Sequence, residues 1–283
     1  MIKNRPIKSP LRYPGSKQKF TNTIINILKN NNLTPNLFIE PFAGGSSVSI
    51  FLLQNNFVNN IALIEKDPLV ASFWDTVFFD SKWLIKEIKK LDITLEKWNY
   101  FKKYKPKTKR NKALKCLFLN RTNFSGILKA GPIGGKTQAS NYKIDCRFNK
   151  EDLINRIQTL AQFQERVLFI EEGDYEEIIL KYKKIIDKNT FIYFDPPYVN
   201  KAKDLYNFYF SEQDHIRLKN FISTVQCNWL LSYDYEPPIN DLYKSFSNCG
   251  FFDIKYTTTA NKHRPLKKEF IASNLNLNTL INY

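Results

Sequence analysis

The sequence has few of the residues on which metal and disulfide sites depend. Only two histidines occur among its 283 residues, and the four cysteines, Cys116, Cys146, Cys227 and Cys249, are separated by 30, 81 and 22 positions. This spacing matches neither a zinc-ligand pattern nor a dense disulfide framework. We therefore expect no metal site, no histidine-based catalytic triad and a reducing, cytoplasmic environment.

Long apolar runs are also lacking. No stretch of about 18 apolar residues exists, so we expect no membrane span. Residues 1–6 contain no apolar segment, so we expect no secretory signal. Hydrophobic residues still make up 43% of the chain, which suffices for one large α/β domain with a smaller insert.

Acidic residues are missing from one internal block. The 48 positions between Glu96 and Asp145 hold 13 Lys or Arg residues and no acid. Over residues 82–156 there are 20 basic and 6 acidic residues, a net charge of +14 in a chain whose net charge is +16. This pattern predicts a polyanion-binding insert at 82–156, within a domain formed by residues 1–81 and 157–283. A merely solvated Lys-rich surface is the alternative, but it leaves the near-neutral remainder unexplained.

Short apolar strands and helical segments alternate on both sides of the insert. Strands are expected at 37–40, 60–64, 167–170, 191–194, 229–231, 252–258 and 270–273. Helices are expected at 16–29, 46–53, from Pro68 onward, 82–100, 114–119, 175–186 and 211–224. We predict a doubly wound, mostly parallel seven-stranded sheet and a mainly helical insert.

The strand expected at 191–194 runs into Asp195-Pro196-Pro197-Tyr198. Neither proline has an N–H group, so the sheet ladder ends there. The Asp195 carboxylate and the backbone carbonyls beside Pro196 can accept hydrogen bonds, and Tyr198 offers a flat ring face. These groups suit a planar ring that carries an exocyclic amino group. The alternative is a turn that only ends the strand, with Tyr198 in the core.

A second group of candidates surrounds a glycine-containing turn. Glu40 ends one strand, and Pro41-Phe42-Ala43-Gly44-Gly45 leads into a helix. Strand, turn and helix in this order form the cofactor-binding element of doubly wound sheets. Glu65, at the tip of the next strand, is placed to accept from ribose hydroxyls, whereas Asp67 precedes Pro68 and is better suited to cap a helix.

Two further segments carry candidates for ligand contacts. Tyr13 and Lys17 open the fold, and a lysine in the first turn of a helix gains nothing from the helix dipole. A ligand carboxylate near Lys17 would explain it; a plain exposed lysine is the alternative. Asp174 can accept from an adenine amino group and Tyr175 can stack on a ring, although Asp174 would serve equally as a helix N-cap.

Residues 120–136 contain four of the nine glycines and read as a hairpin or loop. The side chains it would present are Arg121, Asn123, Phe124, Lys129 and Lys136. Arginine and lysine contact guanine edges, asparagine contacts adenine, and an apolar wedge fills a gap in a base stack. The alternative is a structural hairpin with its phenylalanine pointing inward. Near the end of the chain, a basic loop that includes Arg264 suits phosphates.

The order of these segments resembles that of the Dam-like, α-class (D12-type) S-adenosylmethionine-dependent DNA adenine-N6 methyltransferases. The likeness rests on Asp195-Pro196-Pro197-Tyr198 combined with the Arg-Tyr-Pro-Gly-Ser-Lys opening, and it covers nearly the whole chain. The resemblance implies a methyltransferase sheet with an inserted target-recognition domain. It implies that the residues holding S-adenosylmethionine are Tyr13, Lys17, Glu40, Phe42, Gly44, Gly45, Glu65, Asp174, Tyr175 and Asp195.

The resemblance also assigns a DNA-reading hairpin to residues 120–128, with Phe124 as the intercalating aromatic and Ser125 beside it. Two features depart from the relatives. Glu65 stands where many of them have aspartate, and residues 130–135 differ from the enzymes that read GATC, so that target sequence is not carried over.

The activity that the resemblance implies is methyl transfer to adenine N6 in double-stranded DNA after base flipping. It implies a monomer and a restriction-modification context, with a companion endonuclease acting on the same site; a solitary regulatory enzyme is the alternative. Asp195 and the Pro196 carbonyl would accept hydrogen bonds from the target amino group. Two alternatives stay open: an RNA or protein amino-group methyltransferase, and a catalytically silent DNA-binding protein.

Overall fold

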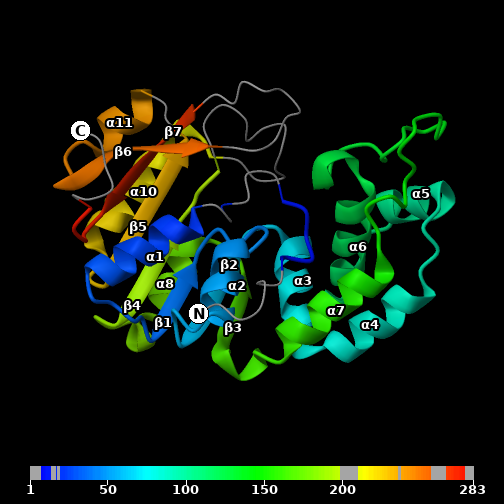
Figure 1. The fold of residues 1–283 in the computed structure, drawn as a ribbon, viewed down its shortest axis with the longest axis horizontal. Helices are drawn as coiled ribbons and strands as arrows, with labels where there is room; N and C mark the ends of the chain where they lie inside the picture. The colour runs from blue at the N-terminus through cyan, green and yellow to red at the C-terminus, as the bar shows by residue number, and fades with distance from the viewer. Residues whose placement is uncertain are drawn as a thin grey trace.

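The computed structural model describes residues 8–13, 17, 20–197, 210–234, 237–255 and 266–277. A seven-stranded sheet with the order β3-β2-β1-β4-β5-β7-β6 lies at its centre (Figure 1). The strands are β1 (Leu37–Glu40), β2 (Asn60–Glu65), β3 (Val167–Glu172), β4 (Thr190–Phe194), β5 (Asn228–Asp234), β6 (Asn248–Lys255) and β7 (Leu266–Ser273). The first five strands are parallel, whereas β7 is antiparallel to both β5 and β6. The predicted mostly parallel α/β sheet is therefore confirmed.

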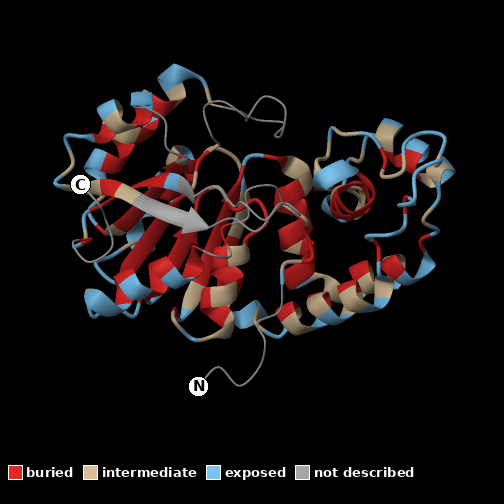
Figure 2. Ribbon diagram, turned by 45° about the horizontal axis from the view of Figure 1, so that its top comes forward, coloured by how far each residue is buried: buried red, intermediate tan, exposed pale blue. Residues whose placement is uncertain are grey.

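Helices cover both faces of this sheet. One face carries α1 (Thr21–Asn30), α2 (Ser47–Gln54) and α3 (Pro68–Phe79), and the other carries α8 (Tyr175–Lys181), α10 (Glu212–Thr224) and α11 (Pro237–Tyr243). Successive strand residues point to opposite faces, so Phe38 joins the first core and Ile39 the second. The central strands β1, β2 and β4 are consequently buried along nearly their whole length, whereas β3 at the edge of the sheet is only partly buried (Figure 2).

The carboxyl ends of the parallel strands place the candidate residues at one edge. β1 lies between β2 and β4, so Glu40, Glu65 and Asp195 come to the same edge of the sheet. Because β7 runs the opposite way, its early residues reach this edge as well. Glu269 of β7 is the register partner of the last residue of β5.

Residues 82–156 form a mainly helical part on one side of the sheet (Figure 1). It contains α4 (Ser81–Lys90), α5 (Leu95–Lys103), α6 (Lys109–Thr122) and α7 (Lys150–Ala161). The helix expected over 82–100 is two helices, because Thr94 caps the start of α5 by accepting from the Lys97 N–H. α6 packs against α3, and the apolar residues of the insert join the core beneath α1, α2 and α3.

Other helix bounds also differ from expectation: α6 extends beyond the expected 114–119, and α8 ends at Lys181 rather than at 186. α1 begins at Thr21 with Phe20 at its N-cap, later than predicted, and Ser16, the expected cap, lies outside the described residues. The longest helix in the described ranges, α6, has 14 residues. No helix in those ranges combines the length and the apolar character that crossing a bilayer requires.

Candidate active site

The glycine turn, residues 41–45, lies directly against Tyr13. Gly44 has a φ of +45°, in the left-handed region that favours glycine. A Cβ atom on Gly44 would lie 2.7 Å from Tyr13 Cε1, and one on Gly45 would lie 2.7 Å from Tyr13 Cβ. Trp74 of α3 donates from Nε1 to the Gly44 carbonyl at 2.8 Å. Both glycines are therefore needed for Tyr13 to rest on this turn.

Glu65 braces the same turn from the end of β2. Its Oε2 accepts from the Gly44 N–H at 2.8 Å, and its Oε1 accepts from the Asp67 N–H at 2.9 Å. Burial raises the pKa of Glu65 to about 7, and the two backbone donors oppose that rise. Asp67 accepts from the Leu69 N–H at 2.8 Å and caps α3, as predicted. The contact between Glu65 and a ribose stays a prediction.

Glu40 ends β1 as a buried carboxyl group. Its Oε2 accepts from Ser49 Oγ at 2.5 Å and from Ser46 Oγ at 3.4 Å, both at the start of α2. Burial raises the pKa of Glu40 to about 8, and the charge of Asp195 adds to the rise. Glu40 therefore binds its proton more tightly than an exposed glutamate does.

Asp195 follows β4 and keeps part of its side chain, 19%, exposed. Its Oδ1 accepts from Ser232 Oγ of β5 at 3.2 Å, and Ser232 in turn bonds to the buried Tyr193 hydroxyl at 2.8 Å. β4 ends at Phe194, where the diproline was expected to end it. Pro196 is buried and Pro197 half-buried, whereas Tyr198 lies outside the described residues.

Lys17 is buried between two carboxylates. Its Nζ lies 3.6 Å from Asp195 Oδ1 and makes a closer ion pair with Glu269 Oε2. Lys17 is 3% exposed, so the alternative of a plain surface lysine is wrong. Glu269 was missed by the sequence analysis. The signal available was an acid directly before the apolar run that ends β7, at residues 270–272.

The first helix after β3 holds the two residues expected to contact a nucleoside. Asp174 caps α8 by accepting from the Glu176 N–H at 3.1 Å and pairs with Arg217 at 2.9 Å, so its N-cap role is confirmed. Tyr175 is buried beside Phe42, with ring centroids 5.3 Å apart. Its hydroxyl is buried and has no hydrogen-bond partner in the described part of the chain. Their contacts with a cofactor stay predictions.

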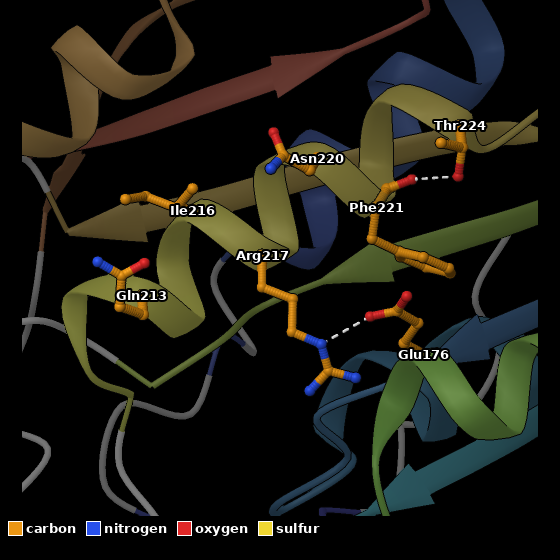
Figure 3. A pocket seen from close by; sticks show the side chains of 7 residues that line it. All are labelled: Glu176, Gln213, Ile216, Arg217, Asn220, Phe221 and Thr224. Carbon is orange, nitrogen blue, oxygen red and sulfur yellow. Dashed lines mark hydrogen bonds and ion pairs between the residues drawn. The ribbon is translucent and has the colours of Figure 1, made fainter.

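A separate pocket of about 410 Å³ opens between α8 and α10 (Figure 3). Arg217 projects into it from α10 and donates from Nε to Glu176 Oε2 at 2.7 Å. The residues that line the pocket are Glu176, Gln213, Ile216, Arg217, Asn220, Phe221 and Thr224. None of them is among the predicted site residues, so this pocket is not the candidate active site.

Two residues expected to contact DNA are used inside the protein instead. α6 extends to Thr122, so Arg121 lies in a helix rather than in a loop. Arg121 Nε donates to the Pro10 carbonyl at 2.7 Å, and burial lowers the pKa of Arg121 to about 10. Asn123 is 0% exposed; it accepts from Trp98 Nε1 at 2.6 Å and donates to two carbonyls of the next turn. The expectation that these two side chains face bases does not hold in this structure.

The recognition loop, residues 123–132, does expose its tip. An antiparallel bridge between Asn123 and Pro132 closes it, with the Phe124 N–H donating to the Gly131 carbonyl at 2.9 Å. Phe124 is 68% exposed, so the alternative with this ring pointing inward is wrong. Ser125, beside it, is exposed with a left-handed φ of +55°.

Three further basic residues were predicted to contact DNA. Lys129, in the recognition loop, and Lys136, just after it, are exposed. Arg264 lies outside the described residues. Contacts of the two lysines with DNA stay predictions.

Comparison with known proteins places these features in one family. The model of a family described as D12 class N6 adenine-specific DNA methyltransferase matches residues 13–259. The chain is 28% identical over 211 residues to the Type II methyltransferase M.CviBI of Paramecium bursaria Chlorella virus NC1A, covering 74% of this chain and 77% of the relative. It is 27% identical over 237 residues to the Type II methyltransferase M.MjaIII of Methanocaldococcus jannaschii, covering 76% and 79%. The Modification methylase StsI of Streptococcus sanguinis is 23% identical over 208 residues, covering 68% of this chain and 29% of that protein.

Proposed function

Because this chain belongs to the D12 class of N6 adenine-specific DNA methyltransferases, we propose that it methylates adenine N6 in double-stranded DNA as a monomer, with S-adenosylmethionine as donor and after base flipping. The observation that carries the proposal is the position of Asp195. This partly exposed carboxylate follows β4 at the same sheet edge as the glycine turn that follows β1.

The residues at this edge fit the proposed cofactor. The unpartnered Tyr175 hydroxyl and the neighbouring Phe42 ring suit a purine that has both a flat face and a polar edge. Glu65 and the Gly44 turn would hold the ribose, and Tyr13 would cover the turn. When bound, S-adenosylmethionine supplies a methyl group that is already activated on a sulfonium.

The protein's own part in the chemistry is alignment. Adenine N6 is a poor nucleophile because its lone pair is delocalised into the ring. Hydrogen bonds from the amino group to Asp195 and to the Pro196 carbonyl favour a pyramidal nitrogen with its lone pair directed at the methyl group. When N6 takes the methyl group, the S–C bond of the donor would break to leave S-adenosylhomocysteine, and N6 would give up a proton, which the Asp195 carboxylate would accept. Ser232 holds Asp195 in place by donating to its Oδ1 atom at 3.2 Å, and the Lys17 ammonium lies 3.6 Å from the same oxygen.

Base flipping is supported by where this site lies and by what the recognition loop exposes. An adenine inside a duplex cannot reach Asp195, so it must leave the stack at a cost of a few kcal/mol. Phe124, exposed at the tip of the recognition loop, is placed to fill the gap, and Tyr198 would stack on the flipped base. The acid-free block around the loop supplies charge for the DNA backbone.

A restriction-modification context is supported by the relatives' names. Two of them are called Type II methyltransferases and a third a modification methylase. We propose that a restriction endonuclease with the same target sequence accompanies this enzyme in the cytoplasm. Digestion of the host DNA by that endonuclease, with and without the methyltransferase gene, tests the pairing.

The activity itself is tested by incubating the purified protein with methyl-labelled S-adenosylmethionine and either duplex DNA or RNA. We expect label in DNA, present as N6-methyladenine within one short sequence when the product is sequenced with detection of modified bases. Label in RNA or protein alone would favour an amino-group methyltransferase of another class. DNA binding without any label would favour a catalytically silent binding protein.

A further inference from the structure

Glu269 is a fully buried carboxylate at the catalytic edge of the sheet. It lies in β7 and is 0% exposed. The antiparallel direction of β7 brings it beside the end of β5, next to the Ser232–Asp195 pair. The family match ends at residue 259, so neither the family range nor the sequence motifs include this residue.

Lys17 connects Glu269 to Asp195. Its buried ammonium makes the close contact with Glu269, whereas Asp195 Oδ1 lies 3.6 Å away, beyond an ordinary N–H···O bond. Two carboxylates thus share one ammonium unequally. Since a buried charge is stable only when it is paired, the position of Lys17 depends on which carboxylates face it.

The unequal sharing has a chemical consequence at Asp195. If Glu269 carried no charge, Asp195 would remain as a charged partner of Lys17. The ammonium would then close to hydrogen-bonding distance on Asp195. A direct charge-assisted bond would occupy a lone pair of this carboxylate and weaken it as an acceptor for an amino group.

We infer that Glu269 is a positioning residue for methyl transfer: it holds the Lys17 ammonium away from Asp195, which stays available to accept from the N6 amino group of the target adenine. This inference deepens the function proposed above and depends on it. Glu269, which lies outside the sequence motifs, would thus take part in the reaction by positioning Lys17.

Several other groups face the cluster and must be considered in any pH experiment. They are Glu40 of β1, Tyr193 of β4 and Tyr233 of β5. Burial raises the pKa of both tyrosines well above the ordinary value, so they stay neutral where enzymes are assayed. Glu40 remains in every variant below and contributes equally to each profile.

Glu269→Gln tests the inference, because it keeps the size of the side chain and removes its charge. Glu172→Gln makes the same change at the end of β3, where the carboxylate is 49% exposed, and serves as control. For both variants and the wild type we would measure single-turnover DNA methylation over about pH 5 to 9. Calorimetric binding of S-adenosylhomocysteine and thermal unfolding provide readouts that are independent of activity.

We expect Glu269→Gln to lower the rate roughly 100-fold, with cofactor-product affinity close to that of the wild type. We also expect the acidic limb of the rate profile to move to lower pH, because Asp195 loses a negative neighbour and ionises more easily. The control should change neither quantity. A Glu269→Gln variant that methylates DNA at the wild-type rate overturns the inference. A lower rate with the acidic limb of the pH–rate profile at its wild-type position overturns it as well.

A double-mutant cycle keeps the test decisive if Glu269→Gln does not fold. Lys17→Met combined with Glu269→Gln removes both members of the buried Lys17–Glu269 pair, so that neither is left buried without the other. Because Glu269 acts through Lys17, the double variant should match Lys17→Met alone within about threefold. A much larger additional loss overturns the inference. A wild type that methylates no DNA would instead refute the proposed function itself.

Discussion

The side-chain amide of Asn120 hydrogen-bonds the backbone of Arg12 in both directions. Oδ1 accepts from the Arg12 N–H at 2.7 Å, and Nδ2 donates to the Arg12 carbonyl at 2.9 Å. The same amide donates to the Gly126 carbonyl in the recognition loop at 2.8 Å. Since the residue after Arg12 is Tyr13, which rests on the glycine turn, one buried side chain joins the recognition loop to the segment that covers this turn.

Asn120→Ala should therefore weaken cofactor binding although Asn120 belongs to the insert. We expect a loss of about 1–3 kcal/mol in the free energy of unfolding, because the Arg12 backbone groups lose their partner. Urea unfolding and calorimetric binding of S-adenosylhomocysteine measure the two effects. Asn111→Ala, the same change near the start of α6, is the matched control. An Asn120→Ala variant with unchanged cofactor affinity would show that Tyr13 is held by other contacts.

Gly44→Ala should impair the glycine turn in two ways. The left-handed backbone costs a non-glycine residue about 1–2 kcal/mol, and the new Cβ would meet the Tyr13 ring at 2.7 Å. Gly135→Ala is the control, because its φ of +75° brings similar strain with no atom within 4 Å of the new Cβ. Calorimetry with S-adenosylhomocysteine should show lower affinity only for Gly44→Ala. Equal affinities would mean that the fit between turn and ring does not matter.

Glu40→Gln should change how stability depends on pH. Burial raises the folded-state pKa of Glu40 to about 8 from an ordinary value of 4.5, so the folded protein holds more protons than the unfolded chain between these values. Wild-type stability should fall as pH rises through this window, by up to a few kcal/mol. Glutamine cannot titrate and still accepts from Ser49. Urea unfolding should show that the free energy of unfolding of the variant, relative to that of the wild type, is higher at pH 8 than at pH 5. The same difference between the two proteins at both pH values would refute the pKa shift.

Phe124→Ala should reduce base flipping while leaving the fold intact. Stacking of an aromatic ring on a base is worth about 1–3 kcal/mol, and the 68%-exposed Phe124 ring contributes little to the core. 2-Aminopurine at the target position reports the extruded base by its fluorescence. Leu180→Ala, which shortens an exposed apolar side chain on α8, is the control. Unchanged 2-aminopurine fluorescence with Phe124→Ala would mean that another side chain fills the space left by the flipped base.

The sheet could be predicted from the sequence because its strands are short apolar runs with strong end signals. The diproline after Phe194 and the Asp67-Pro68 pair mark boundaries that the structure confirms. These signals are local: proline removes a donor, and an aspartate before it caps a helix.

The parts that could not be predicted depend on contacts between distant positions. Lys17 and Glu269 are 252 positions apart and meet only because β7 runs antiparallel to β5. The burial of Arg121 and Asn123 was missed because α6 continues past its apolar run into polar residues. Arg121 binds the Pro10 carbonyl and Asn123 binds Trp98 and the carbonyls of its own turn, and no sequence periodicity reports such partners.

The central claim, that Asp195 aligns the target amino group, is tested most directly with Asp195→Ala in single-turnover methylation at saturating DNA and S-adenosylmethionine. The variant's affinity for duplex DNA is measured in parallel by fluorescence anisotropy. We expect the methylation rate to fall by about 10³-fold or more, while the DNA dissociation constant stays within about threefold of the wild type. Methylation by Asp195→Ala at a rate close to that of the wild type would contradict the account.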